Sequence, residues 1–131
     1  MGKKRFFEGY SALTASSYVD QNFDPPQGRV YVILSVDVSM ENRGFVSIYF
    51  GDRRDSWLPA FKIIERYSGD NTVSIDKLWL VVTDQDRVKI RVSNGSTTSS
   101  STIYLNVEYL DLSREEFDKL KEKLREEYGV I

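Results

Sequence analysis

Cysteine and histidine are both absent from this chain of 131 residues. Without cysteine there is no disulfide bridge and no thiolate nucleophile, and without histidine there is no imidazole to act as an acid or base. Together these absences exclude a zinc site of the usual nitrogen and sulfur kind and a histidine-based catalytic triad. Catalysis would have to use carboxylates, lysine, tyrosine, serine or threonine, and no constellation of these stands out. We therefore expect no enzyme activity, no cofactor and no metal.

An excess of positive charge is also missing. The chain has 18 Lys and Arg against 20 Asp and Glu, with a formal net charge of -2. A general nucleic-acid binder usually carries a basic surplus, so nucleic acid is not an expected partner. The longest apolar runs, 30–34 and 78–82, are far shorter than the roughly 20 residues that span a bilayer. Glu8 and Gly9 interrupt the basic N-terminal start before a signal-peptide core develops, and we expect a soluble protein.

The few labile residues fit a thermophilic protein. Methionine occurs twice and cysteine not at all, beside abundant glutamate, lysine and arginine. That composition is typical of thermophiles, although a short chain can lose rare residues by chance. With 40% hydrophobic residues, a chain of this length can bury the core of one domain without a covalent staple.

The composition divides the chain into three parts. Residues 1–28 are expected to be an N-terminal arm that ends in a linker with two prolines, and its apolar residues are enough for at least one strand or wrapped segment. Residues 29–112 follow a period of two, which predicts seven or eight short antiparallel strands. Residues 113–131 change to the helical period and complete what we expect to be a single domain.

Two long alternating runs begin the strand region. Residues 30–40 are apolar at every even position, which predicts one half-buried strand. After a turn at 41–44, residues 45–50 alternate again and are expected to form a hairpin with the first strand. A third segment, 57–67, contains Pro59, which cannot donate to a ladder and therefore predicts an edge or bulged strand.

The later strands show one irregularity. Val73 and Ile75 have the opposite parity to Leu78, Leu80 and Val82, which predicts a bulge or bend at residues 76–77. Residues 87–93 and 103–109 alternate regularly and predict two further strands. The tract between them, 94–102, contains no apolar residue and predicts a flexible hairpin tip.

The C-terminal segment has the signature of a capped amphipathic helix. Ser113 and Glu116 form a capping box, in which each side chain can bond the backbone N–H of the other. The apolar stripe at helical spacing consists of Phe117, Leu120, Leu124 and Tyr128. This stripe either docks on the chain's own sandwich or forms a seam with a neighbouring molecule, and two heptads are too short for a free-standing coiled coil.

The order of these strands resembles the small jelly-roll modules of virus and phage surface proteins, such as fibre, collar and decoration proteins. The resemblance covers residues 29–112 and lies in five segments: 30–40, 46–50, 74–82, 86–92 and 103–110. It implies a mainly β fold, an antiparallel β-sandwich of jelly-roll type, with the arm and the one C-terminal amphipathic helix added.

For function, the resemblance implies a non-enzymatic viral structural, assembly or attachment component that acts through protein–protein contacts. Its partners would be further copies of the chain or other virion proteins. With the composition, it suggests a protein from a virus of a thermophilic archaeon, located in the virion or the host cytoplasm.

A basic stripe on one strand gives an alternative function. Arg87, Lys89 and Arg91 share one face of the strand, where they could contact phosphates or sulfated glycans as a nucleic-acid-binding accessory protein would. They could equally form a solvated face paired with acids across the sheet, such as Glu108 or Asp37.

Acidic residues in the turns have two interpretations. Calcium could be held by carboxylates in the turns, but no EF-hand spacing occurs, and aspartate is also a common turn former. The residues concerned are Asp52, Asp55, Asp70, Asp84 and Asp86.

Aromatic residues beside the loops give the other alternative, a carbohydrate-binding module. Rings exposed near loops suit sugar stacking or a partner surface, and they also fill sandwich cores routinely. The candidates are Trp57, Trp79, Tyr49 and Tyr67, with Tyr104 beside them. Trp79 has the opposite parity to its apolar neighbours, so it should face outward and be covered, preferably within the same chain by the arm or the helix.

Overall fold

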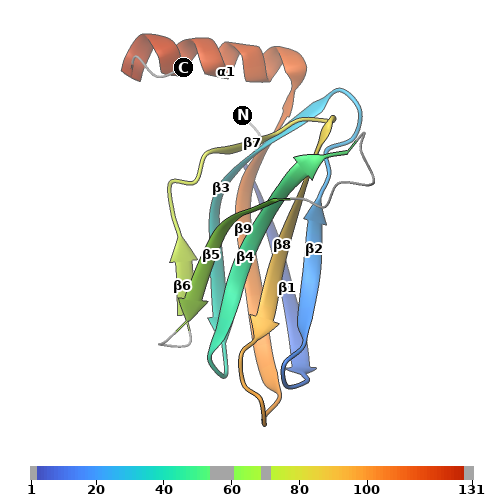
Figure 1. Cartoon of the computed structure of the whole chain (residues 1–131). Coiled ribbons are helices and arrows are strands. Elements are labelled where there is room, and N and C mark those ends of the chain that lie inside the picture. The colour runs from blue at the N-terminus through green and yellow to red at the C-terminus, as the bar shows by residue number, and fades with distance from the viewer. Residues whose placement is uncertain (1–2, 54–60, 69–71, 129–131) are drawn as a thin grey trace.

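The computed structural model describes residues 3–53, 61–68 and 72–128, and the side chains of Ser68, Leu124, Glu127 and Tyr128 lie outside the description. This part of the chain forms nine strands and one helix. The strands make two antiparallel sheets that face each other as a β-sandwich, which confirms the predicted fold class (Figure 1). The helix lies across one end of the sandwich (Figure 1).

Each sheet combines strands from distant parts of the chain. The first sheet, sheet A, has the order β1 (Lys3–Leu13), β9 (Ser101–Ser113), β3 (Arg29–Met40) and β6 (Thr72–Ile75), and β7 (Leu80–Val82) also pairs with β3. The second sheet, sheet B, has the order β2 (Tyr18–Phe23), β8 (Asp86–Asn94), β4 (Gly44–Asp52) and β5 (Phe61–Ser68).

The predicted hairpin between residues 30–40 and 45–50 is wrong. β3 pairs with β9, β6 and β7 in sheet A, whereas β4 pairs with β5 and β8 in sheet B. The turn between β3 and β4 therefore carries the chain from one sheet to the other. Alternation shows that a strand has one buried face, but it does not show which strand is its neighbour. Two consecutive strands alternate in the same way whether they pair as a hairpin or lie in opposite sheets.

Residues 1–28 contribute more than the expected arm. β1 runs along β9, and β2 runs along β8, so the described part of this segment completes one edge of each sheet. The sandwich thus begins near residue 3 and not at residue 29. The proline-rich stretch is the crossover from sheet B to sheet A, and it is fixed where the N–H of Gly28, at a φ of 81°, donates to Asp84 Oδ2 at 2.8 Å.

A bulge reverses the two faces of β3. The register with β9 shifts between Ile33 and Ser35. Before the shift, Ile33 points into the space between the sheets and Val30 and Val32 point outward; after it, the even positions point inward. The prediction of one buried face for residues 30–40 is therefore wrong, because an extra residue in a strand exchanges its faces.

The strand next to this bulge is also interrupted, as predicted for residues 76–77. β6 ends at Ile75 and β7 begins at Leu80, and the backbone between them has positive φ at Lys77 (54°) and Trp79 (46°). The N–H of Leu78 donates to the carbonyl of Leu34 at 3.0 Å, so the interruption is joined to the bulged residue of β3.

The main core fills the space between the sheets. Its fully buried members include Ile33, Val36, Val38, Val46, Ile48, Val88, Ile90, Val92, Ile103, Leu105 and Val107. The strands predicted at 87–93 and 103–109 are confirmed, and their buried apolar positions belong to this core. β5 is an edge strand whose register with β4 shifts between Ile48 and Tyr49, as predicted for this segment, while Pro59 lies outside the described residues.

A second, smaller core lies under the helix α1 (Arg114–Tyr128). Phe117 and Leu120 are buried against Val30, Val32 and Leu112 on the outer face of sheet A. The capping box is present, with the Ser113 N–H donating to Glu116 Oε1 at 2.9 Å and the Glu116 N–H donating to Ser113 Oγ at 3.1 Å. The first half of the predicted stripe therefore docks on its own sandwich, and the Leu124 and Tyr128 side chains lie outside the description.

Within the described residues, no helix combines the length and the apolar character that crossing a membrane requires.

Candidate functional site

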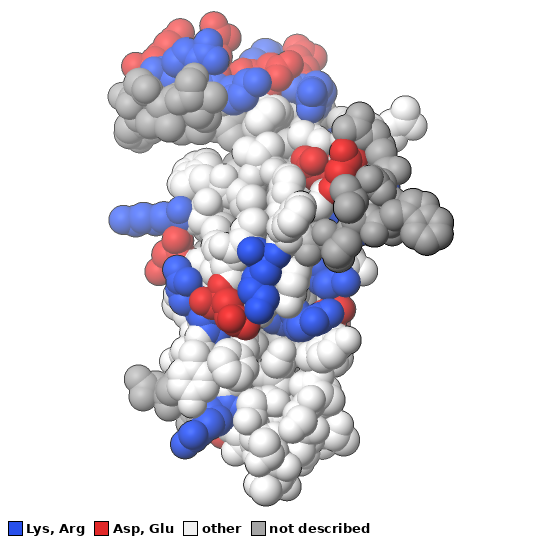
Figure 2. All heavy atoms as spheres, in the orientation of Figure 1, with Lys and Arg blue, Asp and Glu red and all other residues white. Residues whose placement is uncertain are grey.

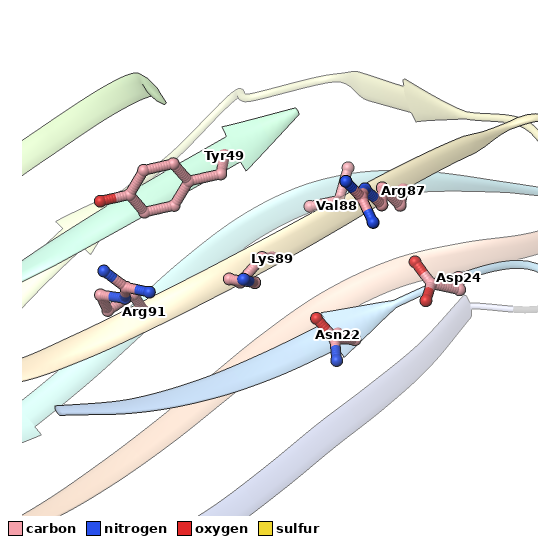
Figure 3. Close-up of a pocket in the computed structure, with 7 residues that line it drawn as sticks. All are labelled: Asn22, Asp24, Tyr49, Arg87, Val88, Lys89 and Arg91. Atoms are coloured by element: carbon pink, nitrogen blue, oxygen red, sulfur yellow. The ribbon is translucent and has the colours of Figure 1, made fainter. Parts of the chain in front are cut away.

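The outward face of sheet B carries the predicted basic stripe. Arg87, Lys89 and Arg91 alternate along β8 with the buried residues Val88 and Ile90, so all three cations point away from the core. The face is hollowed to a volume of about 440 Å³ (Figure 3). Its lining residues come from β2, the residues after it, β4 and β8, and they are Asn22, Asp24, Tyr49, Arg87, Val88, Lys89 and Arg91.

Arg91 is held in place by an acid and two rings. Its Nε and Nη2 donate to Asp20 Oδ1 and Oδ2 at 2.7 and 3.1 Å, and Asp20 lies directly across the β2–β8 ladder. The guanidinium carbon lies 3.8 Å from the centroid of the Tyr18 ring and 5.2 Å from that of Tyr49. Hydrogen bonding from Arg91 lowers the pKa of Asp20, and the same bond raises the pKa of Arg91.

The charge of the stripe is partly compensated by an acid on β2, a strand that the sequence did not indicate as its partner. Lys89 Nζ also lies 3.7 Å from Asp20 Oδ2, so one carboxylate serves two cations. The partners suggested from sequence, Glu108 and Asp37, are wrong, since both lie on sheet A: Glu108 pairs with Lys3 and Arg5, and Asp37 accepts from Ser74.

Acidic and basic side chains lie beside one another across the middle of this face, seen from the side of sheet B in Figure 2. A surface that follows a phosphate backbone needs cations whose charge is available to several phosphates. Here Asp20 already binds two of the three, so this face gives little support for nucleic-acid binding.

The candidate aromatic residues are not brought together. Tyr49 lies in the stack on sheet B, and Tyr67 is half exposed on β5, where its ring contacts that of Phe45 at 5.1 Å between centroids. Trp79 belongs to the interruption beside β3 in sheet A, and Trp57 lies outside the described residues. Tyr49, Tyr67 and Trp79, the three that the structure describes, therefore do not form one surface on which a sugar could stack.

Trp79 is 50% exposed, so the expected covering within the chain is wrong. α1 packs over Val30, Val32 and Leu112, and both β9 and β3 lie between β1 and the segment of Trp79. Neither element that could have covered the indole is therefore placed beside it.

The edge strand β5 is a surface that the sequence reasoning missed. Phe61 is 72% exposed, Ile63 45% and Tyr67 52%, and of the side chains described on this strand only Ile64 packs against the core. Lys62 and Glu65 lie between them and bond to each other at 3.1 Å. The interspersed charges were the available signal, because they break the alternation that a half-buried strand would show.

Of the predicted turn aspartates that the structure describes, Asp84 and Asp86 act as turn residues, whereas Asp52 is the last residue of β4. Asp84 accepts from the Gly28 N–H, and Asp86 accepts from the N–H and the hydroxyl of Thr83, both at 2.9 Å. Asp55 and Asp70 lie outside the described residues. Among the residues that are described, no three acidic side chains are grouped so that they could hold a metal ion.

The far end of the sandwich, opposite the helix, is organised around one buried amide. Asn94 is 3% exposed, and its Nδ2 donates to the carbonyls of Leu13, Thr14 and Ser99 at 2.9 to 3.2 Å. Its Oδ1 accepts from the Ser96 N–H at 3.0 Å. The tract predicted as a flexible tip is thus fastened to the β1–β2 turn at its start.

No protein-family model and no curated protein sequence matches this chain.

Proposed function

We propose that this chain is a non-enzymatic assembly or attachment component, of the kind that virions are built from, and that two copies associate through β5. The observation that carries the proposal is the exposure of three large apolar side chains, Phe61, Ile63 and Tyr67, on one edge strand of the sandwich. An unpaired strand edge with apolar side chains is a template for pairing with another chain.

The strand order supports the wider part of the proposal. Successive strands alternate between the two sheets, except that β4 and β5 are neighbours in sheet B and β6 and β7 both pair with β3. We infer that this interleaving is that of a jelly roll, a fold used by viral capsid and lectin domains. Fold alone does not assign function, so the proposal rests on the surface of β5.

Three other edges are less suited to pairing. β1 carries Lys3, Lys4 and Arg5, and charged side chains on an edge discourage pairing. β6 and β7 have only four and three residues. β2 has six residues, and its Asp20 is bound to Arg91.

The charges of β5 fit a second copy. In an antiparallel pair related by a two-fold axis, one register places Lys62 opposite Glu65 of the other copy, and the symmetry repeats the pair. The same register places Phe61 opposite Arg66. Opposite charges and a cation beside a ring then meet across the interface.

Light scattering after size exclusion, at several protein concentrations, tests the proposal. We expect the native chain to approach twice its mass of 15.2 kDa as concentration rises. Ile63→Lys should remain a monomer, because it replaces an exposed apolar side chain of the strand edge with a positive charge. Phe7→Lys adds the same charge to the edge strand of sheet A and should associate like the native chain.

A charge exchange sharpens the test. Glu65→Lys should weaken association, and adding Lys62→Glu to it should restore association, since the cross-strand pair is then reversed. A native chain that is monomeric at every concentration, or an Ile63→Lys variant with the native mass, would show that β5 is not the interface.

A further inference from the structure

A second hollow, of about 360 Å³, lies on the outer face of sheet A and was not indicated by the sequence. It crosses β1, β9, β3 and β6, away from the small core beneath the helix. Its lining residues are Phe7, Asp37, Val38, Ser39, Thr72, Val73, Ser74, Tyr104 and Asn106.

Two rings form one side of this hollow. Phe7 and Tyr104 are nearly parallel, with centroids 6.0 Å apart and 20° between their planes. They are 62% and 49% exposed, so both offer apolar ring surface to a ligand. Parallel rings held on a rigid sheet are suited to stacking against a flat apolar surface.

A glycine sets the position of the second ring. Gly9 lies opposite Tyr104 in the β1–β9 ladder, and a Cβ added to it would be 3.1 and 3.2 Å from Tyr104 Cε1 and Cδ1. Those distances are too close for an unshifted ring. The absence of a side chain at residue 9 therefore lets Tyr104 lie against the strand beside Phe7.

Polar groups form the other side. Asp37, Asn106 and Ser74 lie in one row across the ladder, and the Ser74 hydroxyl donates to Asp37. The Oδ1 of Asn106 is buried and has no hydrogen-bond partner among the residues that the structure describes. A buried amide oxygen without a partner is unusual in folded proteins, and a half-turn of the amide exchanges its donor and acceptor ends.

The charge of the hollow restricts its ligand. Among the described lining residues, Asp37 is the sole charged one and none is lysine or arginine, whereas the hollow on sheet B is lined by three cations. A lone carboxylate repels phosphate, sulfate and carboxylate groups. It accepts hydrogen bonds from hydroxyl groups readily.

We propose that this hollow binds a neutral oligosaccharide. A hexose ring has an apolar face of C–H groups and an edge of hydroxyls, which match the two rings and the polar row respectively. Phe7 and Tyr104 stack on the sugar faces, and Asp37 and Asn106 bond the hydroxyls. None of the described residues that line the hollow belongs to β5, so this proposal does not rest on the β5 interface.

Calorimetric titration of the native chain with four neutral hexasaccharides tests this proposal: cellohexaose, laminarihexaose, maltohexaose and β-1,4-mannohexaose. A heparin hexasaccharide serves as the anionic probe. We expect at least one neutral probe to bind with a Kd below about 1 mM, and the heparin probe to bind more weakly. No detectable binding of any of the four neutral probes, or tighter binding of the heparin probe, would overturn the proposal.

Three variants locate the site. Tyr104→Ala should weaken binding at least about tenfold, and Gly9→Ala should weaken it less, because its Cβ displaces the ring without removing it. Tyr67→Ala removes a similarly exposed ring from sheet B and should bind like the native chain. Native affinity in Tyr104→Ala, or an equal loss in Tyr67→Ala, would place binding elsewhere; unchanged thermal midpoints establish that the variants are folded.

Discussion

At the scale of single residues, two polar side chains hold together segments that lie outside the hydrophobic core. Asn94 joins the β1–β2 turn to the loop between β8 and β9 at one end of the sandwich. Asp20 joins β2 to the cations of β8 on the outer face of sheet B. Asp20 and Arg91 are 71 positions apart in the sequence, and Asn94 and Leu13 are 81 positions apart. No local sequence pattern could therefore indicate these contacts.

Replacing Asn94 with alanine should destabilise the fold by about 2 to 3 kcal/mol, because three backbone carbonyls lose a donor in a buried place. Urea denaturation followed by circular dichroism measures the change. Thr97→Ala, in the exposed part of the same tract, is the control and should stay within about 0.5 kcal/mol of the native value. An equal effect of the two substitutions would mean that the amide does not organise the tip.

The Asp20 contact should make stability depend on acid pH. Its pKa is lowered in the folded chain by the bond from Arg91, below an ordinary value of 3.8, so the unfolded chain binds the proton more readily. The stabilisation is therefore present at neutral pH and is lost as the pH falls below 3.8 through the lowered pKa.

Asp20→Asn should accordingly cost about 1 kcal/mol at pH 7, and the difference from the native chain should shrink toward pH 2. Urea denaturation of both proteins across this pH range measures it. A difference that is independent of pH would contradict the assigned role of the ion pair.

At the scale of elements, the helix and the bulge of β3 depend on each other. The bulge turns Val30 and Val32 outward, and α1 covers them with Phe117 and Leu120. The helix itself was predictable, because its capping box and its apolar spacing are local signals. The bulge was not, since apolar residues continue at every even position through Leu34 and the two halves of the strand bury opposite faces.

Leu120→Ala should lower the free energy of unfolding by about 2 kcal/mol, since the side chain is buried at the edge of the small core. Lys119→Ala, a neighbouring position that is 76% exposed, is the matched control and should change it little. Chemical denaturation measures both. A loss in Leu120→Ala no larger than that in Lys119→Ala would mean that the helix is not docked as described.

At the scale of the whole molecule, the sandwich class was predictable from sequence and the pairing of strands was not. Alternation identified most strands, but it could not place β3 and β4 in different sheets or bring residues 3–23 into both. The candidate sites were predicted less well: the basic stripe shares a face as expected, whereas Trp79 and Tyr49 lie on opposite sheets. Surfaces such as β5 and the Phe7–Tyr104 pair depend on which strands become neighbours, and that depends on the tertiary fold.

Amide hydrogen exchange at two protein concentrations tests the central claim, self-association through β5, most directly. We predict that the β5 amides that face away from β4 exchange at least about tenfold more slowly at high concentration than in dilute solution, because a second copy pairs with them. The amides of β2, the opposite edge of the same sheet, should exchange equally in both. Equal exchange of β5 at the two concentrations, or protection of β2 in its place, would contradict the account.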